Sequence, residues 1–299
     1  MGLNIVVLVK QVPDTKNITA QAMKEDGTVN RSALPAIYNP EDLNALEMAL
    51  QTKERYGGEI TVFTMGPPFA DEVLREALYR GADKVYLISD KKFAGADTLA
   101  TSYALMCAIK SKVPNFDIIF CGRQAIDGDT AQVGPQTAEK LRISQVSYAI
   151  NLEEINDNKV IVERLIEGGR EKLKVPLPVL ITVVNEANIP RPPSAKRIMK
   201  YKRAFSLFET DKAFSIWGQE HQDEERLKEF LLEKGLLIPV LTAEDIEANE
   251  DMIGLCGSPT KVKKIDYIIL KGGEFKRIEP TDEAMRSFIK ELIADHTFG

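Results

Sequence analysis

Residues 117–136 read DIIFCGRQAIDGDTAQVGPQ, and this stretch decides the fold. A short apolar run, typical of a buried strand, is followed by a glycine-containing loop and then by a segment that resumes as a helix. This order of strand, loop and helix is the repeating unit of parallel α/β sheets. Open sheets of that kind hold ligands at the carboxyl ends of their strands. The stretch therefore predicts both a fold class and the edge at which a site would lie.

The chain before this stretch repeats the same unit. β-Branched and apolar runs predict strands at Ile5–Val9, Ile60–Met65, Lys84–Ile88 and Asp117–Cys121. Helix-like segments separate these runs, as expected where helices cover a parallel sheet. The sequence thus predicts an α/β fold with a mostly parallel, doubly wound sheet and helices on both faces.

Capping and stop signals place the helices of this first half. Asn39 can cap a helix that begins at Pro40 and stops at Gly57. A second helix is expected over Asp71–Arg80, and a third begins at the capping residue Asp97. A polar segment over Ile18–Arg31 interrupts the alternation.

The second half of the sequence shows a different pattern of expected strands and helices. Strands of a hairpin are expected at Val160–Ile166 and Glu171–Val175, followed by the apolar run Val179–Val184. After Arg203 the chain becomes polar, with helix-like Glu224–Glu233 and Asp282–Ile293. We therefore divide it into a nucleotide-binding domain, residues 1–203, and a C-terminal arm, residues 204–299, that would pack on another chain. A small second domain or a solvated extension fits the composition of residues 204–299 equally well.

Composition excludes several classes of function. The 299 residues carry a formal charge of −6, which argues against nucleic-acid binding. No apolar run approaches the ~20 residues that span a bilayer, and the N-terminal run is expected to be a strand rather than a signal peptide. The three cysteines lack paired spacing, so neither a disulfide framework nor a metal site is expected. The two histidines, His221 and His296, lie far from the glycine-containing loop, so no catalytic acid or base is assigned.

The loop after Asp117–Cys121 could hold an anion. Its backbone N–H groups and the N-terminus of the following helix would face phosphate oxygens, and glycines at 122, 128 and 134 would let the main chain approach a ligand. The loop is neither a Walker loop nor a dinucleotide fingerprint, because it lacks both Gly-Lys-Ser/Thr and Gly-x-Gly-x-x-Gly. From residue chemistry alone, a nucleotide site and a structural loop are equally well supported.

Residues at the ends of the other strands would complete the same crevice. The candidate cofactor-binding residues are Leu8, Lys10, Asn39, Asp42, Met65, Gly66, Cys121, Gly122, Arg123, Gln124, Ala125, Ile126, Asp127, Gly128, Asp129, Thr130, Gln132, Val133, Gly134, Pro135 and Gln136. Taken singly, Lys10 is as easily a solvated charge and Met65 a core residue.

These segments resemble the electron transfer flavoprotein beta subunit family over about the first 200 residues. The stretch Val162–Thr182 is similar to the family signature in residue type and spacing. It matches at Arg164, Glu167, Gly168, Gly169, Glu171, Leu173, Pro178 and Thr182. Similar short motifs lie at residues 9–14, 39–40, 65–67, 80–83, 97–100 and 124–127.

The resemblance implies a cytoplasmic heterodimer whose alpha subunit holds one FAD. In many members the beta pocket holds AMP without a redox role. In another branch it holds a second FAD, which oxidises NADH and divides the electrons between a low-potential acceptor such as ferredoxin and an acyl-CoA dehydrogenase or enoyl-CoA reductase. The AMP type has an acidic run after its Ile-Asp, whereas this chain continues with Gly128–Gln136, so the two-FAD branch is expected.

The resemblance also implies a docking loop for the dehydrogenase or reductase. The residues that match its frame are Arg191, Ala195, Ile198, Met199 and Lys200. Some members carry a protruding leucine where this chain has Ala195, so its partner would be gripped differently.

Overall fold

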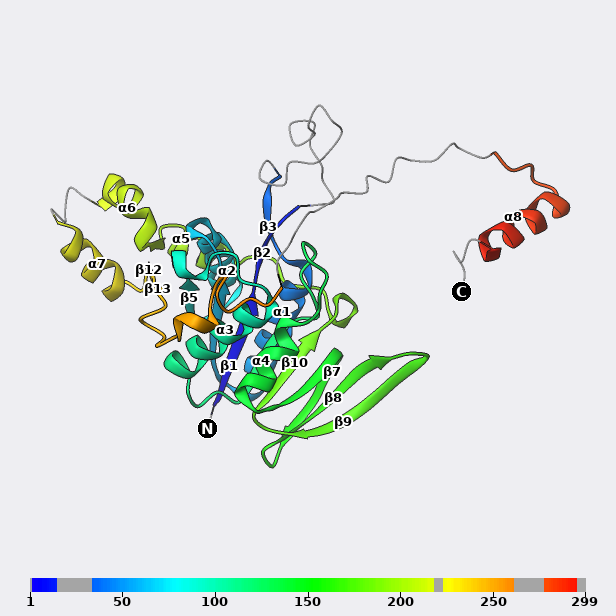
Figure 1. Ribbon diagram of the computed structural model, residues 1–299, viewed down its shortest axis with the longest axis horizontal. Coiled ribbons are helices and arrows are strands. Elements are labelled where there is room, and N and C mark those ends of the chain that lie inside the picture. The colour runs from blue at the N-terminus through cyan, green and yellow to red at the C-terminus, as the bar shows by residue number, and fades with distance from the viewer. Residues whose placement is uncertain (1, 15–33, 218–222, 261–276, 295–299) are drawn as a thin grey trace. The chain divides into compact units, whose positions relative to one another are not determined.

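The computed structural model describes residues 2–14, 34–217, 223–260 and 277–294 (Figure 1). The chain forms two compact units, Met1–Lys263 and Lys264–Gly299. The polar segment expected over Ile18–Arg31 lies outside the described residues. The first unit contains every strand of the expected sheet.

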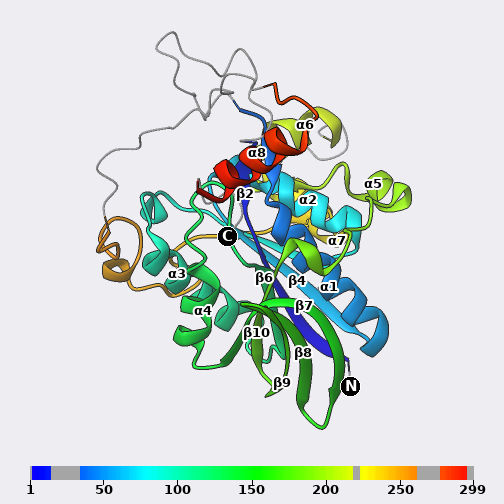
Figure 2. The same ribbon diagram turned by 90° about the vertical axis from the view of Figure 1, so that its right-hand side faces the viewer.

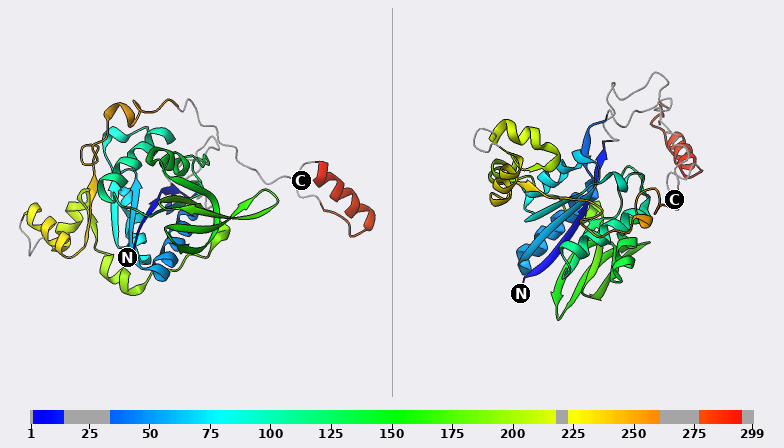
Figure 3. Two further views of the ribbon diagram at one scale, coloured as in Figure 1. Left: turned by 90° about the horizontal axis from the view of Figure 1, so that it is seen from below. Right: turned by 60° about the vertical axis from the view of Figure 1, so that its left-hand side comes forward.

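A nine-stranded sheet runs through the described part of the first unit, in the order β13-β5-β4-β1-β6-β10-β7-β8-β9. The pairs from β13 to β7 are parallel, and β7, β8 and β9 continue the sheet as an antiparallel meander (Figures 2 and 3). The strands are β1 (Leu3–Val9), β4 (Gly58–Met65), β5 (Lys84–Ile88), β6 (Ile118–Gly122), β7 (Ser144–Asn156), β8 (Lys159–Ile166), β9 (Gly169–Pro176), β10 (Val179–Val183) and β13 (Val240–Leu241). This confirms the expected α/β class.

Helices cover both faces of the sheet (Figure 2). They are α1 (Pro40–Tyr56), α2 (Asp71–Arg80), α3 (Thr98–Lys112) and α4 (Val133–Leu141). Helix α5 (Ala195–Tyr201) packs against α2. Side chains alternate along β1, so Ile5 and Val7 pack in one core cluster with α1 and α2, while Val6 and Leu8 pack in the other with α3 and α4. Both faces are buried, which explains why the central strands read as continuous apolar runs.

Smaller elements complete the described chain. They are β2 (Gln11–Pro13), β3 (Ala36–Tyr38), β11 (Phe205–Ser206), β12 (Leu237–Ile238), α6 (Thr210–Trp217), α7 (Glu224–Glu233), α8 (Asp282–Ala294), and 3-10 helices at Pro68–Ala70, Lys91–Phe93, Asn185–Ala187, Leu207–Glu209 and Glu250–Met252. Helix α8 belongs to the second unit. None of the helices in the described ranges is both long and apolar enough to cross a bilayer.

Strand β7 is the element that the sequence analysis did not identify. Its apolar residues do not alternate regularly, because its pairing with β8 shifts register twice and its pairing with β10 shifts once. Each shift moves the following side chains to the opposite face. The period of two, by which a strand is recognised, is therefore lost.

Residues just beyond Arg203 are fastened to the first unit by a buried ionic network. The carboxylate of Asp71 accepts hydrogen bonds from the Ser206 hydroxyl at 2.7 Å and from the Arg75 guanidinium at 2.8 Å. Arg75 also pairs with Glu209 and donates to the carbonyl oxygen of Ala204 at 3.0 Å. The compact unit consequently continues through Lys263, beyond the expected boundary at Arg203. That residues 204–299 hold a partner subunit stays a prediction.

Arg75→Ala should destabilise the protein by roughly 3 kcal/mol, because it leaves the buried carboxylate of Asp71 without its cation and Glu209 paired only with the exposed Lys212. Chemical denaturation of wild type and variant measures this difference. Lys84→Ala is the matched control, since it removes an exposed ion pair with Glu59 and should change stability by no more than about 0.5 kcal/mol. Equal effects of the two substitutions would contradict a structural role for the network.

Candidate functional site

The carboxyl ends of the central parallel strands meet at one edge of the sheet. Leu8 of β1 is paired with Cys121 of β6, which in turn is paired with Thr182 of β10. The loop of residues 123–132 leaves β6 at this edge and leads into α4. The structure therefore brings the loop and the end of β1 together, as the sequence predicts.

Asp42, in the first turn of α1, joins the ends of two strands. One carboxylate oxygen accepts the backbone N–H of Gly122 at 2.9 Å, and the other accepts that of Lys10 at 2.8 Å. A Cβ at Gly122 would lie 2.5 Å from the Asp42 carboxylate, so only glycine permits this approach. Burial raises the pKa of Asp42 to about 7 although both hydrogen bonds favour its charged form.

Asn39 acts differently from what its capping position suggests. It occupies the N-cap of α1 but its side chain makes no capping hydrogen bond. Instead its amide donates to the carbonyl oxygen of Gln124 at 2.9 Å, and its side-chain oxygen accepts the N–H of Ile126 at 3.2 Å. Asn39 thus occupies the expected N-cap position, but the expected capping hydrogen bond is wrong, because its side chain binds the loop instead.

Glu41 is the functional candidate that the sequence analysis missed. Its carboxylate accepts the backbone N–H of Gln124 and pairs with the Arg123 guanidinium, each at 2.9 Å. Burial raises the pKa of Glu41. Its position in a first helical turn, directly after Pro40, is the only signal in the sequence, and acidic residues are common at that position for reasons of the helix dipole alone.

The loop backbone is bent at residues other than its glycines. Asp129 and Ala131 have φ angles of 49° and 52°, in the left-handed region that side chains disfavour. Alternation of right- and left-handed residues turns successive N–H groups toward one point and forms an anion-binding concavity. Helix α4 then begins at Val133 without a side-chain cap, so the N–H groups of Val133 and Gly134 are left for a ligand, while Pro135 has none.

Two of the three glycines make room for other parts of the protein. Gly122 makes room for α1, and a Cβ at Gly134 would lie 2.8 Å from the sulfur of Cys121, so this glycine lets α4 pack on the sheet. Gly128 faces open space and has no left-handed φ. The expectation that all three allow a close ligand approach is therefore wrong for Gly122 and Gly134, which approach protein atoms.

Acidic and amide side chains of the loop have partners within the chain. Lys10 pairs with Asp127 at 2.7 Å, and the Gln124 amide donates to Asp129 at 3.1 Å. The Thr98 hydroxyl of α3 donates to Gln132 at 2.9 Å. These contacts reduce the negative charge that the loop presents to an incoming anion.

Some predicted residues can contribute only their backbone. The side chains of Leu8 and Cys121 are buried in the core beneath α3 and α4, and Met65 and Val133 pack against the same cluster. Thr130 is exposed in the loop. The other predicted positions at this edge are Gly66, Ala125, Pro135 and Gln136. The N–H of Gly66 donates to the carbonyl oxygen of Ile88, and the N–H of Gln136 donates to the carbonyl oxygen of Gln132.

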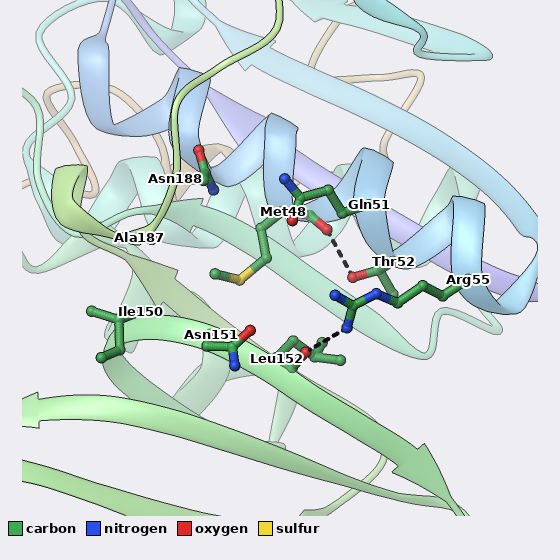
Figure 4. A pocket seen from close by; sticks show the side chains of 9 residues that line it. All are labelled: Met48, Gln51, Thr52, Arg55, Ile150, Asn151, Leu152, Ala187 and Asn188. Atoms are coloured by element: carbon green, nitrogen blue, oxygen red, sulfur yellow. Dashed lines mark hydrogen bonds between the residues drawn. The ribbon is translucent and has the colours of Figure 1, made fainter.

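Two cavities in the described part of the chain lie away from the loop. One of about 30 Å³, the size of a single water, is lined by α1, β7 and the turn at Asn185–Ala187 (Figure 4). The other, about 310 Å³, is lined by Leu99, Tyr103, Lys140 and residues 251–252 and 256–259. Within the described ranges, no three His, Cys, Asp or Glu side chains gather as metal ligands would.

The predicted docking residues divide into fixed and exposed ones. Arg191 is fixed to α1 by ion pairs with Glu47 and Glu54. Ala195, Met199 and Lys200 are exposed on α5, and Ile198 is half-buried. The surface is thus held rigidly while part of it stays open.

The chain resembles known proteins over almost its whole length. The family model described as "Electron transfer flavoprotein domain" matches residues 26–205. An electron transfer flavoprotein subunit beta from Thermoanaerobacterium thermosaccharolyticum is 45% identical over 260 residues, 87% of this chain and 86% of that protein. This chain belongs to the electron transfer flavoprotein beta subunit family.

Two further members of the electron transfer flavoprotein family carry names that mention a reductase. The caffeyl-CoA reductase-Etf complex subunit CarD of Acetobacterium woodii is 40% identical over 98% of this chain and 99% of its own length. The acryloyl-CoA reductase electron transfer subunit gamma of Anaerotignum propionicum is 40% identical over the same shares. Relatives of this chain are therefore subunits of redox complexes.

Asp42→Asn should change how stability depends on pH. An ordinary aspartate loses its proton near pH 4 in the unfolded chain, whereas folded Asp42 keeps it to about pH 7, so wild type loses stability relative to the variant as pH rises through this window. The change is roughly 1.4 kcal/mol per pH unit at most. Melting temperatures at pH 5 and pH 8 measure it.

Asp90→Asn is the control, because backbone N–H donation from Lys92 lowers the pKa of Asp90. The difference in stability between Asp90→Asn and wild type should not change between pH 5 and pH 8, since the Asp90 carboxyl is ionised in both the folded and the unfolded state. A flat difference for Asp42→Asn as well would contradict the raised pKa.

Proposed function

We propose that this chain is the beta subunit of an electron-dividing flavoprotein complex and that its loop at residues 122–136 holds FAD. The observation that carries the proposal is the bent backbone at Asp129 and Ala131, directly before an uncapped helix. Strained residues that are not glycine persist where the surrounding structure fixes them for a purpose. Convergent N–H groups at a helix start are suited to the phosphates of a dinucleotide.

The side chains around the loop fit such a group. Arg123 and Lys10 place cations beside the loop, although each is paired with a carboxylate of the chain. Among the described residues the buried Nε of Arg123 has no hydrogen-bond partner. Gly128 faces open space, so no neighbouring atom blocks a ligand on that side of the loop. AMP, bound without a redox role, is the alternative, because the same phosphate contacts would serve it.

A bound flavin would accept hydride from NADH and pass single electrons onward. The chain itself needs only to position the flavin, set its electrostatics and exclude competing reactions. A scarcity of histidines agrees with this role, although His221 and His296 both lie outside the described residues. No residue of the chain is assigned as a catalytic acid or base.

The proposed partners follow from the family and from the names of the relatives. An alpha subunit would complete the heterodimer, and an acyl-CoA dehydrogenase or enoyl-CoA reductase would receive electrons at the surface around Met199 and Lys200. A low-potential acceptor such as ferredoxin would take the other electron, and the complex would work in the cytoplasm. Names such as caffeyl-CoA reductase-Etf complex support a reductase partner.

The purified heterodimer should contain two FAD and no AMP, and anaerobic addition of NADH should bleach flavin absorbance. Acid extraction followed by chromatography measures both nucleotides in one sample. One FAD with one AMP per heterodimer would sink the two-flavin proposal and leave this subunit with a non-redox nucleotide.

Two substitutions at Ala131 test the loop itself. Ala131→Val places a β-branched side chain at a φ of 52°, so the loop should lose its shape and the complex should keep only the alpha-subunit FAD. Ala131→Gly suits the same φ and should retain both flavins. Full flavin content in the valine variant would exclude this loop as the site.

Helix α8 offers a test of the C-terminal arm. Met285, Ile289 and Ile293 are about half exposed at helical spacing, and an isolated helix of this length is marginal in water. Ile289→Asp should weaken co-purification of the alpha subunit, whereas Lys290→Ala should not. A chain ending at Lys263 is the matching truncation, since a cut at Arg203 would remove Ser206 and Glu209 from the ionic network. If both Ile289→Asp and the truncated chain form as much heterodimer as wild type, α8 does not contact the alpha subunit.

A further inference from the structure

Tyr148 lies at an irregularity in the sheet beside the candidate site. The pairing of β10 with β7 shifts register between Ile181 and Val183, so that β7 carries an extra residue there. Tyr148 has a φ of 61°, and its N–H donates to the Thr182 hydroxyl at 3.1 Å. Thr182 is paired with Cys121, the residue that directly precedes the loop 122–136.

This conformation is costly and needs a reason. A left-handed φ is rare for an aromatic residue and costs on the order of 1–3 kcal/mol. Packing does not supply the reason, since the side chain of Tyr148 is 42% exposed. Bulges occur at sheet edges and beside functional sites, where they redirect a side chain.

The redirected ring lies under a cation of the loop. The guanidinium carbon of Arg123 is 5.6 Å from the centroid of the Tyr148 ring, within the range of a cation–π contact. On another side, Arg123 pairs with Glu41 at 2.9 Å. A long side chain that would otherwise sample many rotamers is thus held at two points, while its Nε finds no acceptor in the part of the chain that the structure describes.

We propose that Tyr148 is a positioning residue for the nucleotide site: its ring, turned by the strained bulge, holds the Arg123 guanidinium at the start of the loop, ready for a phosphate. The inference rests on the proposed function, because it needs a nucleotide at this loop. Either FAD or AMP would supply the phosphate. The chemistry that Arg123 recognises is the same for both.

Four variants of the full heterodimer separate the ring from the backbone. Tyr148→Phe keeps the ring, Tyr148→Gly removes it while relieving the left-handed backbone, Arg123→Gln removes the charge, and the last combines the glycine and glutamine changes. FAD and AMP are titrated by calorimetry into complex from which the beta-site nucleotide has been stripped, at low and high salt.

We expect Tyr148→Gly to bind the nucleotide about 3- to 10-fold more weakly and Tyr148→Phe to restore near wild-type affinity. The double variant should be no weaker than Arg123→Gln alone, because the ring acts only through the cation. The salt dependence of binding should fall in both Tyr148→Gly and Arg123→Gln, an effect that relief of backbone strain would not produce.

Several results would overturn the proposal. If Tyr148→Gly binds the nucleotide as tightly as wild type, or if the losses in the double variant are additive, the ring does not act through Arg123. The proposed function would still stand in that case, provided that wild type binds the nucleotide. Absence of FAD and AMP binding to wild type would overturn both. Weaker heterodimer formation by Arg123→Gln with unchanged nucleotide affinity would assign Arg123 to the subunit interface instead.

Discussion

The site depends on one buried carboxylate. Asp42 accepts N–H groups from the ends of β1 and β6, and thereby holds the first turn of α1 against the edge of the sheet. Because α1 is held there, Asn39 and Glu41 come within reach of the loop and fix the backbone of Gln124 and Ile126. The shape of the loop is therefore set from a helix about 80 positions earlier in the chain.

Most of the sheet could be predicted because its information is local. A strand buried on both faces is recognised by its apolar run, and helices such as α2 and α7 begin and end at the expected residues. The cap at Asp97 was predictable for the same reason, since its carboxylate accepts N–H groups two and three residues ahead. Strand β7 was not, because its bulges abolish the alternation by which a strand is recognised.

Contacts of the site were harder to predict than its location. The order of strand, loop and helix located the loop, but nothing local distinguishes Asn39 as a cap from Asn39 as a clamp on residues 124–126. The sequence analysis singled out the glycines of the loop, whereas Asp129 and Ala131 are the loop residues with left-handed backbone. The hydrogen bonds that clamp the loop come from Asn39 and Glu41, more than 80 positions earlier, and a sequence read segment by segment does not contain them.

The last strand of the sheet, β9, has one side without a neighbouring strand in the described structure. Its residues are exposed or half-buried throughout, and Arg170, Lys172 and Lys174 recur at every second position. Arg170 and Lys172 pair with Glu163 of β8 and Glu153 of β7, and charged side chains along an edge strand disfavour its pairing with another chain. The described edge of the sheet at β9 is thereby kept from pairing with a second copy of the chain.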